Sequence, residues 1–383
     1  MSTLKVDAIR HNSATSDAIT TAADGTCTAK LTSVGGGQLS NRNLVINGAM
    51  NVAQRATSST ANGYAALDRY RNVYNGTDEA PTQSQVDVAA GTTPYTLGFR
   101  KALRITNGNQ TGGAGATDGI EIWQRIESQN MANSGWNYLS SSSFVTFQFW
   151  IKSSVAQNFQ GYLLNEDTNQ NTFPFETGSL TANTWTKVTK VVPGNSNLTF
   201  NNDNGTGLRV AIVPFLGTDF TSNSLSLDTW AAYNHPSNFT RDCTTTWYTT
   251  NDATLEITGL QLEVGDTATS FEHRNFTDEI LRCQRYYTTY KTTAHHGRGG
   301  SSSSASFDFQ TPVPLRTTPT VTNLNLSTMR RYDNTNYGVG SATASAHDLQ
   351  GNCVRVSFNN LSNVTDNYTC WLVLNNMGLD AEL

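Results

Sequence analysis

Short strand-like runs separated by turn residues fill the middle of this chain, and they constrain its fold more than any other feature. About nine such runs follow one another between residues 43 and 274, among them KALRITNG, FVTFQFWIK, LRVAIVPFLG and LEITGLQLEV. Clusters of Gly, Asn, Asp and Ser lie between them, which is the pattern of turns. No helical crossover pattern separates the runs, so the strands are expected to be antiparallel. The sequence therefore predicts an all-β chain with a central antiparallel jelly-roll β-sandwich over residues 43–274.

One of these runs shows how a strand divides its side chains between two faces. Successive residues of a strand point to opposite faces. One set is expected to face the core: Val145, Phe147, Phe149 and Ile151. The residues between them face the other way, with Trp150 at the edge of the core. Trp185 and Trp371 also lie in strand-like runs, and we expect both of them to be buried.

The composition favours the all-β class and argues against several functions. Charged residues make up 14% of the 383 residues, and the polarity comes from Ser, Thr, Asn, Gln and Gly, which favour turns and strand faces. The net charge is −5 and no basic run is interleaved with aromatic residues, so no nucleic-acid partner is expected. A run of about 18 apolar residues, needed for membrane insertion, is missing, as is the apolar core of a signal peptide. We expect synthesis in the cytoplasm without export by the general secretory route.

Residues 1–42 predict an extended arm and linker instead of a folded domain. Two short strand-like stretches, LKVDAI and SDAITTAADGTCTAK, are followed by the Gly-rich linker SVGGGQLSN. Isolated short strands are not stable in water. The arm is therefore expected to dock on another copy of itself or on a partner protein.

A short helix and a second β-domain are expected after the sandwich. Thr277 is the expected N-cap of a connecting helix within residues 275–290, because Asp278 and Glu279 follow it and apolar residues recur at helical spacing. Residues 291–383 repeat the strand pattern at smaller scale and predict a small C-terminal β-sandwich. The helix either packs three copies around an axis or joins the two domains. Its apolar residues would be buried between chains in a trimer and against the chain's own sandwich in a monomer: Ile280, Leu281 and Tyr287.

Several segments resemble tail-fibre-like proteins of tailed bacteriophages, particularly those of marine phages. They are NLVINGAMNVAQR with ALDRY, ATLEITGLQLEVGDTATSFEHR, LRCQRYY, PVPLRTTPTV and the closing LDAEL. Together these segments span most of residues 43–383. The resemblance implies a homotrimeric virion fibre that is made in the host cytoplasm and attached to other proteins of the phage tail or capsid through residues 1–42. It also implies a central domain similar to carbohydrate-binding jelly rolls and a C-terminal tip that projects towards the host.

Three functions are consistent with such a fibre. The first is non-enzymatic adhesion to a host surface polysaccharide or outer-membrane protein, strengthened by several copies per particle. The second is a glycan depolymerase, which needs two carboxyl groups facing across a cleft. Paired acids such as Glu166 and Asp167 are adjacent in the sequence, and adjacent residues of a strand point to opposite faces, so we expect no enzymatic activity. The third is a purely architectural role in the capsid or tail.

The side chains that sugar binding requires indicate where a binding site would lie. Aromatic rings stack on the apolar faces of sugars, while polar side chains bind the hydroxyl groups. Two loop-like segments, DTWAAYNHP and MRRYDNTNY, are predicted to expose aromatic side chains. The candidate glycan-binding residues belong to these segments: Trp230, Tyr233, Arg330, Arg331, Tyr332 and Tyr337. Ordinary loop packing is the alternative for their aromatic side chains.

Metal binding has few candidates in the sequence, and no cofactor is expected beyond a possible structural calcium ion. His295 and His296 lie in a Gly/Ser-rich stretch that suggests a loop, where three copies could share a metal ion; ordinary polar surface is the alternative. Asp203 lies in NNDNGTG, which resembles a calcium loop but has Gly205 at a ligand position, so a tight turn is the alternative. The five cysteines form no C-x-x-C motif and predict buried free thiols.

Overall fold

The arm at the start of the chain carries a small sheet without a core of its own. The structure is a computed structural model and describes residues 6–10, 12–13, 15, 17–25, 27–29, 40–233 and 238–383. Three short antiparallel strands form the sheet: β1 (Ala8–Ile9), β2 (Ile19–Thr21) and β3 (Cys27–Ala29). Val6 and Ile9 are 42% and 54% exposed, and no described residue of the arm belongs to an apolar cluster. The predicted linker lies mostly outside the described residues.

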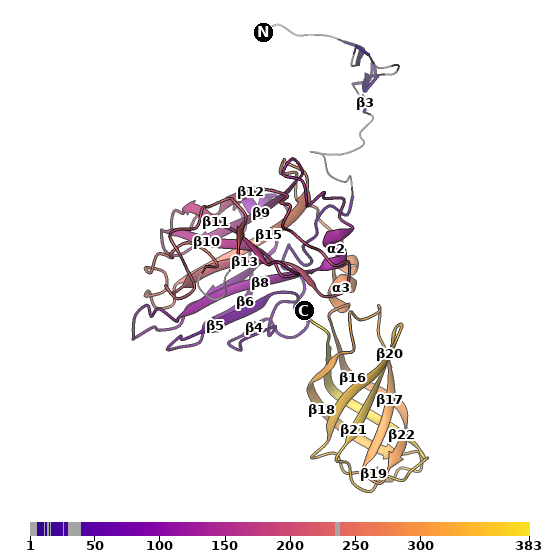
Figure 1. Cartoon of the computed structure of the whole chain (residues 1–383). Coiled ribbons are helices and arrows are strands. Elements are labelled where there is room, and N and C mark those ends of the chain that lie inside the picture. The colour runs from indigo at the N-terminus through magenta and orange to yellow at the C-terminus, as the bar shows by residue number, and fades with distance from the viewer. Residues whose placement is uncertain are drawn as a thin grey trace.

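The central domain consists of two six-stranded antiparallel sheets (Figure 1). The first sheet has the order β14 (Ala231–Ala232), β11 (Asn171–Ser179), β10 (Asn158–Asn165), β13 (Thr206–Leu216), β8 (Gly119–Glu127) and β5 (Arg71–Asn75). The second has the order β12 (Thr186–Pro193), β9 (Phe144–Ser153), β15 (Thr254–Val264), β7 (Lys101–Thr106), β6 (Thr82–Asp87) and β4 (Ser58–Ser59). Two short helices lie in the connections: α1 (Thr93–Thr96) and α2 (Ser128–Ala132).

The strands of the central domain pair in a nested order. β10 pairs with β11, β9 with β12, β8 with β13 and β7 with β15. Each of these pairs encloses the previous one along the chain, as in a jelly roll. The prediction of an all-β antiparallel sandwich is confirmed.

The core of the central domain lies between its two sheets. The four residues expected there have no exposed surface: Val145, Phe147, Phe149 and Ile151. The ring of Phe147 lies 5.9 Å from that of Phe175 on the first sheet, which joins the two sheets through aromatic packing. Trp150 is partly exposed in a small outer cluster. Trp185 and Trp371 are also partly exposed, so the expectation that both are buried is wrong.

The connecting helix is shorter than predicted and starts earlier. Helix α3 (Phe276–Gln284) is capped by Asn275, whose side chain accepts a hydrogen bond from the backbone N–H of Asp278 at 2.9 Å. The expected cap at Thr277 is wrong because Asn275 has the extended backbone that an N-cap requires. Residues 287–290, expected in the helix, begin a strand instead. No helix in the described ranges combines the length and apolar character that crossing a membrane demands.

The C-terminal domain is one curled sheet, which corrects the prediction of a small two-sheet sandwich. Its seven antiparallel strands follow the order β19 (Asn336–Tyr337), β18 (Thr320–Arg331), β22 (Thr369–Asp380), β16 (Tyr287–Ser301), β17 (Ser304–Gln310), β21 (Cys353–Asn359) and β20 (Thr343–Gln350). Repeated register shifts between β18 and β22 bend the sheet. As a result β18 comes into contact with β20, and the sheet encloses a single core (Figure 1).

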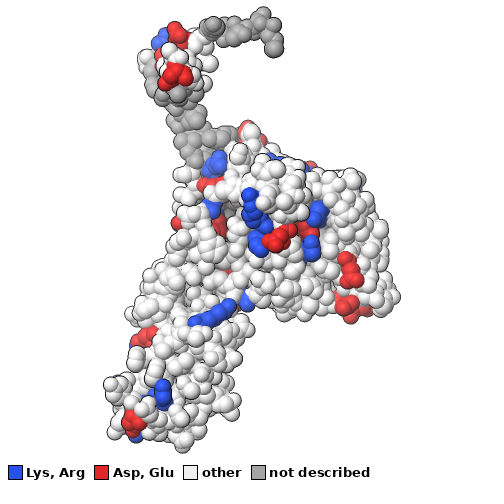
Figure 2. Space-filling model, turned by 180° about the vertical axis from the view of Figure 1, so that it is seen from behind, with Lys and Arg blue, Asp and Glu red and all other residues white. Residues whose placement is uncertain are grey.

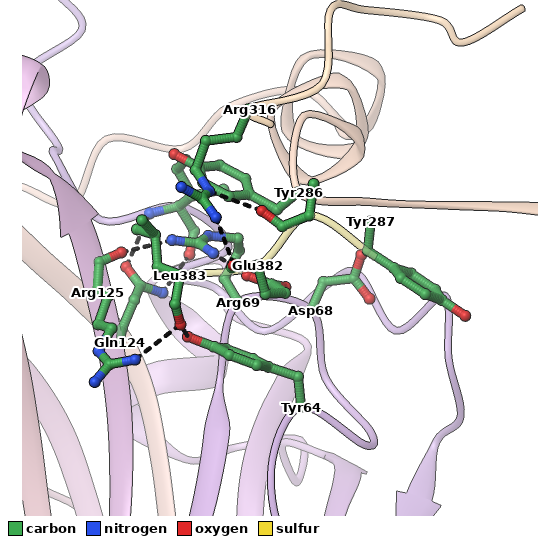
Figure 3. A network of polar contacts seen from close by, with 12 residues as sticks. Tyr64, Asp68, Arg69, Gln124, Arg125, Tyr286, Tyr287, Arg316, Glu382 and Leu383 are labelled. Atoms are coloured by element: carbon green, nitrogen blue, oxygen red, sulfur yellow. Dashed lines mark hydrogen bonds and ion pairs between the residues drawn. The ribbon is translucent and has the colours of Figure 1, made fainter. Parts of the chain in front are cut away.

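The residues at the end of β22 fasten the C-terminal domain to the central domain (Figure 3). Glu382 pairs with Arg69 and with Arg55, whose side chains come from the central domain. The carbonyl oxygen of Leu383 accepts hydrogen bonds from Arg125 at 2.9 Å and from the Tyr64 hydroxyl at 3.1 Å. These contacts define the domain junction, and they fix the direction in which the C-terminal domain extends.

Tyr287 belongs to this junction and not to a contact between chains. Its side chain is 1% exposed, and the guanidinium of Arg55 lies 3.6 Å from the centre of its ring. Of the two predicted environments, Tyr287 has the one inside its own chain, and its predicted place between chains is not supported. Ile280 and Leu281 of α3 are partly exposed.

Candidate functional site

Six side chains form a row across six adjacent strands on the outer face of the C-terminal sheet. The strand register places Arg330 opposite Trp371, and Trp371 opposite His296. On the next strands it places Asp308 opposite Arg355, and Arg355 opposite His347. Because Gly297 pairs with Phe307, Asp308 neighbours His296 and joins the two halves. We term this set the polar row: Arg330, Trp371, His296, Asp308, Arg355 and His347.

The strand alternation explains why these side chains face outwards. Their sequence neighbours fill the core of the C-terminal domain: Cys370, Leu372, Phe307, Phe309, Val354 and Val356. Residues between core residues of a strand point to the opposite face. The polar row is thus a direct consequence of the burial of its neighbours.

Trp371 is the aromatic centre of the polar row. Its indole is partly exposed, and the guanidinium of Arg330 lies 4.5 Å from the ring centre. On the other side, the His296 ring is nearly parallel to the indole, at 12°, with the ring centres 6.4 Å apart. An aromatic surface with polar groups on both sides is the arrangement expected of a sugar-binding site.

A hollow of about 540 Å³ lies beside Trp371. Its walls come from the β16–β17 hairpin, from β21 and from the connection before β22: His296, Gly297, Arg298, Gly299, Gly300, Ser306, Asp308, Arg355, Asp366 and Asn367. Glycine is required at residue 297, because a Cβ atom there would lie 2.5 Å from the ring of Phe307. The small residues leave room on the outer face for a ligand the size of a few sugar units.

Two of the acidic groups near the row are already paired. Arg355 binds Asp308 through two hydrogen bonds of 2.8 and 3.2 Å, and these lower the pKa of that carboxyl group. Arg331 likewise pairs with Asp333 and lowers its pKa. Figure 2 shows one face of the molecule, on which charged side chains are sparse over the C-terminal domain and gather with mixed signs on the central domain.

The candidates in the segment from Met329 to Tyr337 have different environments. Tyr332 is 84% exposed in the turn after β18, and Arg330 and Arg331 are partly exposed. Tyr337 is only 4% exposed because it lies in β19, opposite Met329, and packs into the core. Its predicted exposure is wrong. Tyr368, which the sequence did not single out, is 54% exposed, with Arg331 lying 5.0 Å from its ring centre.

The candidates in the central domain do not form an exposed site. Trp230 is 8% exposed, donates a hydrogen bond to the carbonyl oxygen of Pro193 at 2.7 Å and packs against Phe173. Its predicted exposure is wrong because its segment adds an edge strand to the first sheet. Tyr233 is partly buried, with its ring centre 5.0 Å from that of Phe239. Burial also raises the pKa of the Tyr233 hydroxyl.

The histidine pair lies in a strand, which corrects the prediction of a loop. His296 faces outwards in the polar row, whereas the His295 ring lies 4.3 Å from that of Phe309, and burial lowers the pKa of His295. Neighbours on opposite faces cannot bind one ion together. Asp203 accepts a hydrogen bond from the N–H of Gly205 at 2.9 Å, as in a tight turn. No group of three or more metal-ligating side chains occurs among the described residues.

Comparisons with known proteins leave the family of the chain open. No family model and no curated protein matches it. The enzymatically active domain of tailspike protein 4 from bacteriophage CBA120 is 10% identical over 58% of this chain and 21% of its own, with a TM-score of 0.31. The cellulose-binding domain of Cellulomonas fimi β-1,4-glucanase C is 11% identical over 57% of this chain and 99% of its own, with a TM-score of 0.26. The family 11 carbohydrate-binding module from Clostridium thermocellum is 8% identical over 56% and 98%, with a TM-score of 0.25. Likenesses at this level assign no ligand or activity.

A second hollow, of about 350 Å³, lies on the outer face of the second central sheet. Trp150, Gln148 and Lys187 contribute to its walls. Its other rings, those of Phe99 and Phe271, pack against each other with their centres 4.9 Å apart. Since these rings are occupied with internal packing, the polar row is the better candidate for ligand binding.

The sequence alone contained part of the signal for the polar row. In YTCWLVL the alternation places Trp371 on the face opposite Cys370 and Leu372. That pattern could have identified Trp371 as an outward residue at the sheet surface. His296, Asp308 and Arg355 could not have been joined to it, because their strands are separate in the sequence and only the register brings them together.

Proposed function

We propose that this chain is a non-enzymatic fibre protein of a phage virion that binds a host surface glycan through the outer face of its C-terminal domain. The observation that carries the glycan-binding site is Trp371, partly exposed between Arg330 and His296 and beside a polar hollow. Multivalent display on a particle would strengthen binding at each site by raising the effective concentration of the other copies.

The virion role is supported by the sequence resemblance and by the arm. The strands of the arm are two or three residues long, and its apolar Val6 and Ile9 are exposed. Such a sheet gains stability only against a partner surface. We propose that this partner is another protein of the phage tail or capsid.

We propose a homotrimer, as the sequence resemblance implies, and helix α3 offers apolar groups for its contacts. Phe276 is 57% exposed. Leu281, Val313 and Pro314 line a largely apolar hollow of about 350 Å³ beside the helix. Covering these groups between copies would remove apolar surface from water. Light scattering of the purified chain should give three times the monomer mass of 41.6 kDa; a monomer mass at micromolar concentration would contradict this expectation.

Trp371→Ala is expected to weaken glycan binding about tenfold or more, since truncating a central aromatic residue of a binding site removes most of its contact energy. Binding is measured on an array of bacterial surface polysaccharides and then by calorimetry. The matched control is Trp185→Ala, which removes another partly exposed tryptophan with a cation nearby, the Lys152 amine at 5.1 Å from its ring centre. Equal effects of the two substitutions would argue against the proposed site.

A glycan depolymerase is the second candidate, favoured by the presence of Asp308 and Asp366 in one hollow. Glycoside hydrolysis requires one carboxyl group that stays protonated to act as the acid. The Arg355 guanidinium lowers the pKa of Asp308, so Asp308 is suited to the role of the ionised carboxylate and Asp366 would have to be the acid. Release of oligosaccharides from the bound polysaccharide, abolished by Asp366→Asn, would replace the adhesion proposal by the depolymerase.

A further inference from the structure

We infer that the glycan bound at the polar row is acidic, and that Arg298 and Arg330 bind its carboxylate or sulfate groups. This inference rests on the proposed function and names the class of its ligand. It follows from the ion pairing around Trp371, where some charges are paired within the chain and others are not.

Arg330 has no acidic partner among the described residues. Its side chain forms neither an ion pair nor a hydrogen bond with these residues, and its guanidinium lies over the face of Trp371. An arginine that stacks on an aromatic ring keeps its N–H groups directed sideways. These donors are therefore available to an anion at the edge of the indole.

Arg298 is the second arginine near Trp371 that forms no ion pair with any described residue. It is exposed on β16, two residues from His296 and on the same face, and it lines the hollow. One of its terminal nitrogens donates a hydrogen bond to the side-chain oxygen of Asn367. That contact orients the guanidinium over the hollow without neutralising it.

The acidic groups that the structure describes around the row do not compensate these two cations. Arg355 engages both oxygens of Asp308. Asp333 is held by Arg331 and by the backbone N–H of Thr335. Asp366 is the one carboxylate of the hollow for which the described residues provide no ion pair. Among the described residues around the row, two unpaired arginines thus outnumber one unpaired carboxylate.

A guanidinium binds a carboxylate or sulfate with two parallel, charge-assisted hydrogen bonds. An acidic sugar bound beside Trp371 would bring its charged group to the N–H groups of Arg330, whose guanidinium lies over the indole from the neighbouring strand. The chain as a whole carries a net charge of −5, so general attraction does not account for polyanion binding. Local recognition by Arg298 and Arg330 is required.

The test compares the full-length chain with Arg298→Gln/Arg330→Gln on matched pairs of polysaccharides. Polygalacturonate and its methyl ester differ in the free carboxylate, and dextran sulfate and dextran differ in the sulfate. The array of bacterial polysaccharides contains both acidic and neutral members. The wild type should bind acidic members about tenfold or more tightly than neutral partners, and 0.5 M salt should weaken this binding. The double substitution should remove the preference, whereas the control Arg241→Gln, on the central domain, should keep it.

The outcomes separate this inference from the function on which it rests. Neutral glycans could bind in a way that depends on Trp371 but not on Arg298 and Arg330. That result would overturn the inference of an acidic ligand and leave the proposed function standing. Binding of acidic glycans that persists in the Arg298→Gln/Arg330→Gln variant would also overturn the inference. Absence of binding to every glycan of the array would overturn both. A preference for dextran sulfate over polygalacturonate would identify sulfate as the recognised group.

Discussion

Arg69→Ala is expected to lower the free energy of unfolding by about 3 to 5 kcal/mol, because it leaves a buried carboxylate without its main partner. The side chains of Arg69 and Glu382 are 1% and 4% exposed where they meet at the domain junction. The Arg69 guanidinium also lies 3.4 Å from the ring centre of Tyr286 and donates a hydrogen bond to the carbonyl oxygen of Arg125 (Figure 3). Loss of all three contacts would loosen the C-terminal domain from the central domain.

The control for this prediction is an ion pair of the same kind on the surface. Arg355 and Asp308 are 48% and 50% exposed, so Arg355→Ala should cost no more than about 1 kcal/mol. A double variant, Arg69→Met with Glu382→Leu, should recover much of the stability, because apolar side chains can replace a buried ion pair. Calorimetric unfolding measures all three variants. A loss for Arg69→Ala no larger than that for Arg355→Ala would show that the buried pair does not hold the junction.

The strands and core of the central domain could be predicted because they follow from local alternation. Val145 and Phe147 point inwards simply because every second residue of their strand is apolar. The loop aromatics could not be placed in this way. Trp230 lies in a segment rich in polar residues, yet it is buried because β14 pairs with the edge of the first sheet and carries the indole against Phe173. Exposure in loops depends on tertiary packing that a local pattern does not contain.

In the C-terminal domain, too, the local sequence pattern did not contain the pairing that forms the candidate site. The stretch around His295 and His296 has the composition of a flexible loop, but β22 and β17 provide hydrogen-bond partners along it and make it a strand. Once it is a strand, the two histidines must face opposite ways, and His296 joins Trp371. The polar row is a property of strand register, so it could be recognised only after the pairing of β18, β22, β16, β17, β21 and β20 was known.

Asp68→Asn is expected to raise the free energy of unfolding, relative to wild type, by about 3 kcal/mol between low and neutral pH. Asp68 has no exposed surface, and burial raises the pKa of its carboxyl group to about 6, from an ordinary value of 3.8. Gln54 donates a backbone hydrogen bond to it at 2.8 Å, and the charge of Arg55 also favours the ionised form, but neither offsets the loss of solvation. Glu382 opposes ionisation as well.

Whether stability rises or falls with pH depends on which state, folded or unfolded, holds the proton of Asp68. Between about pH 4 and pH 6 the folded chain keeps a proton on Asp68 that the unfolded chain has released, so stability from this group falls as pH rises. A shift of about two pKa units corresponds to about 3 kcal/mol. The asparagine side chain of the variant cannot ionise, so the stability of the variant relative to wild type should rise by about this amount from about pH 4 to about pH 7.5, as measured by urea unfolding.

Asp308→Asn is a control for which the change in stability with pH should have the opposite sign. Because Arg355 lowers the pKa of Asp308, the wild type gains stability from this group above its ordinary pKa and loses it as pH falls. The stability of Asp308→Asn relative to wild type should therefore fall slightly as pH rises. Parallel curves for Asp68→Asn and wild type would mean that the pKa of Asp68 is the same in the folded and the unfolded chain.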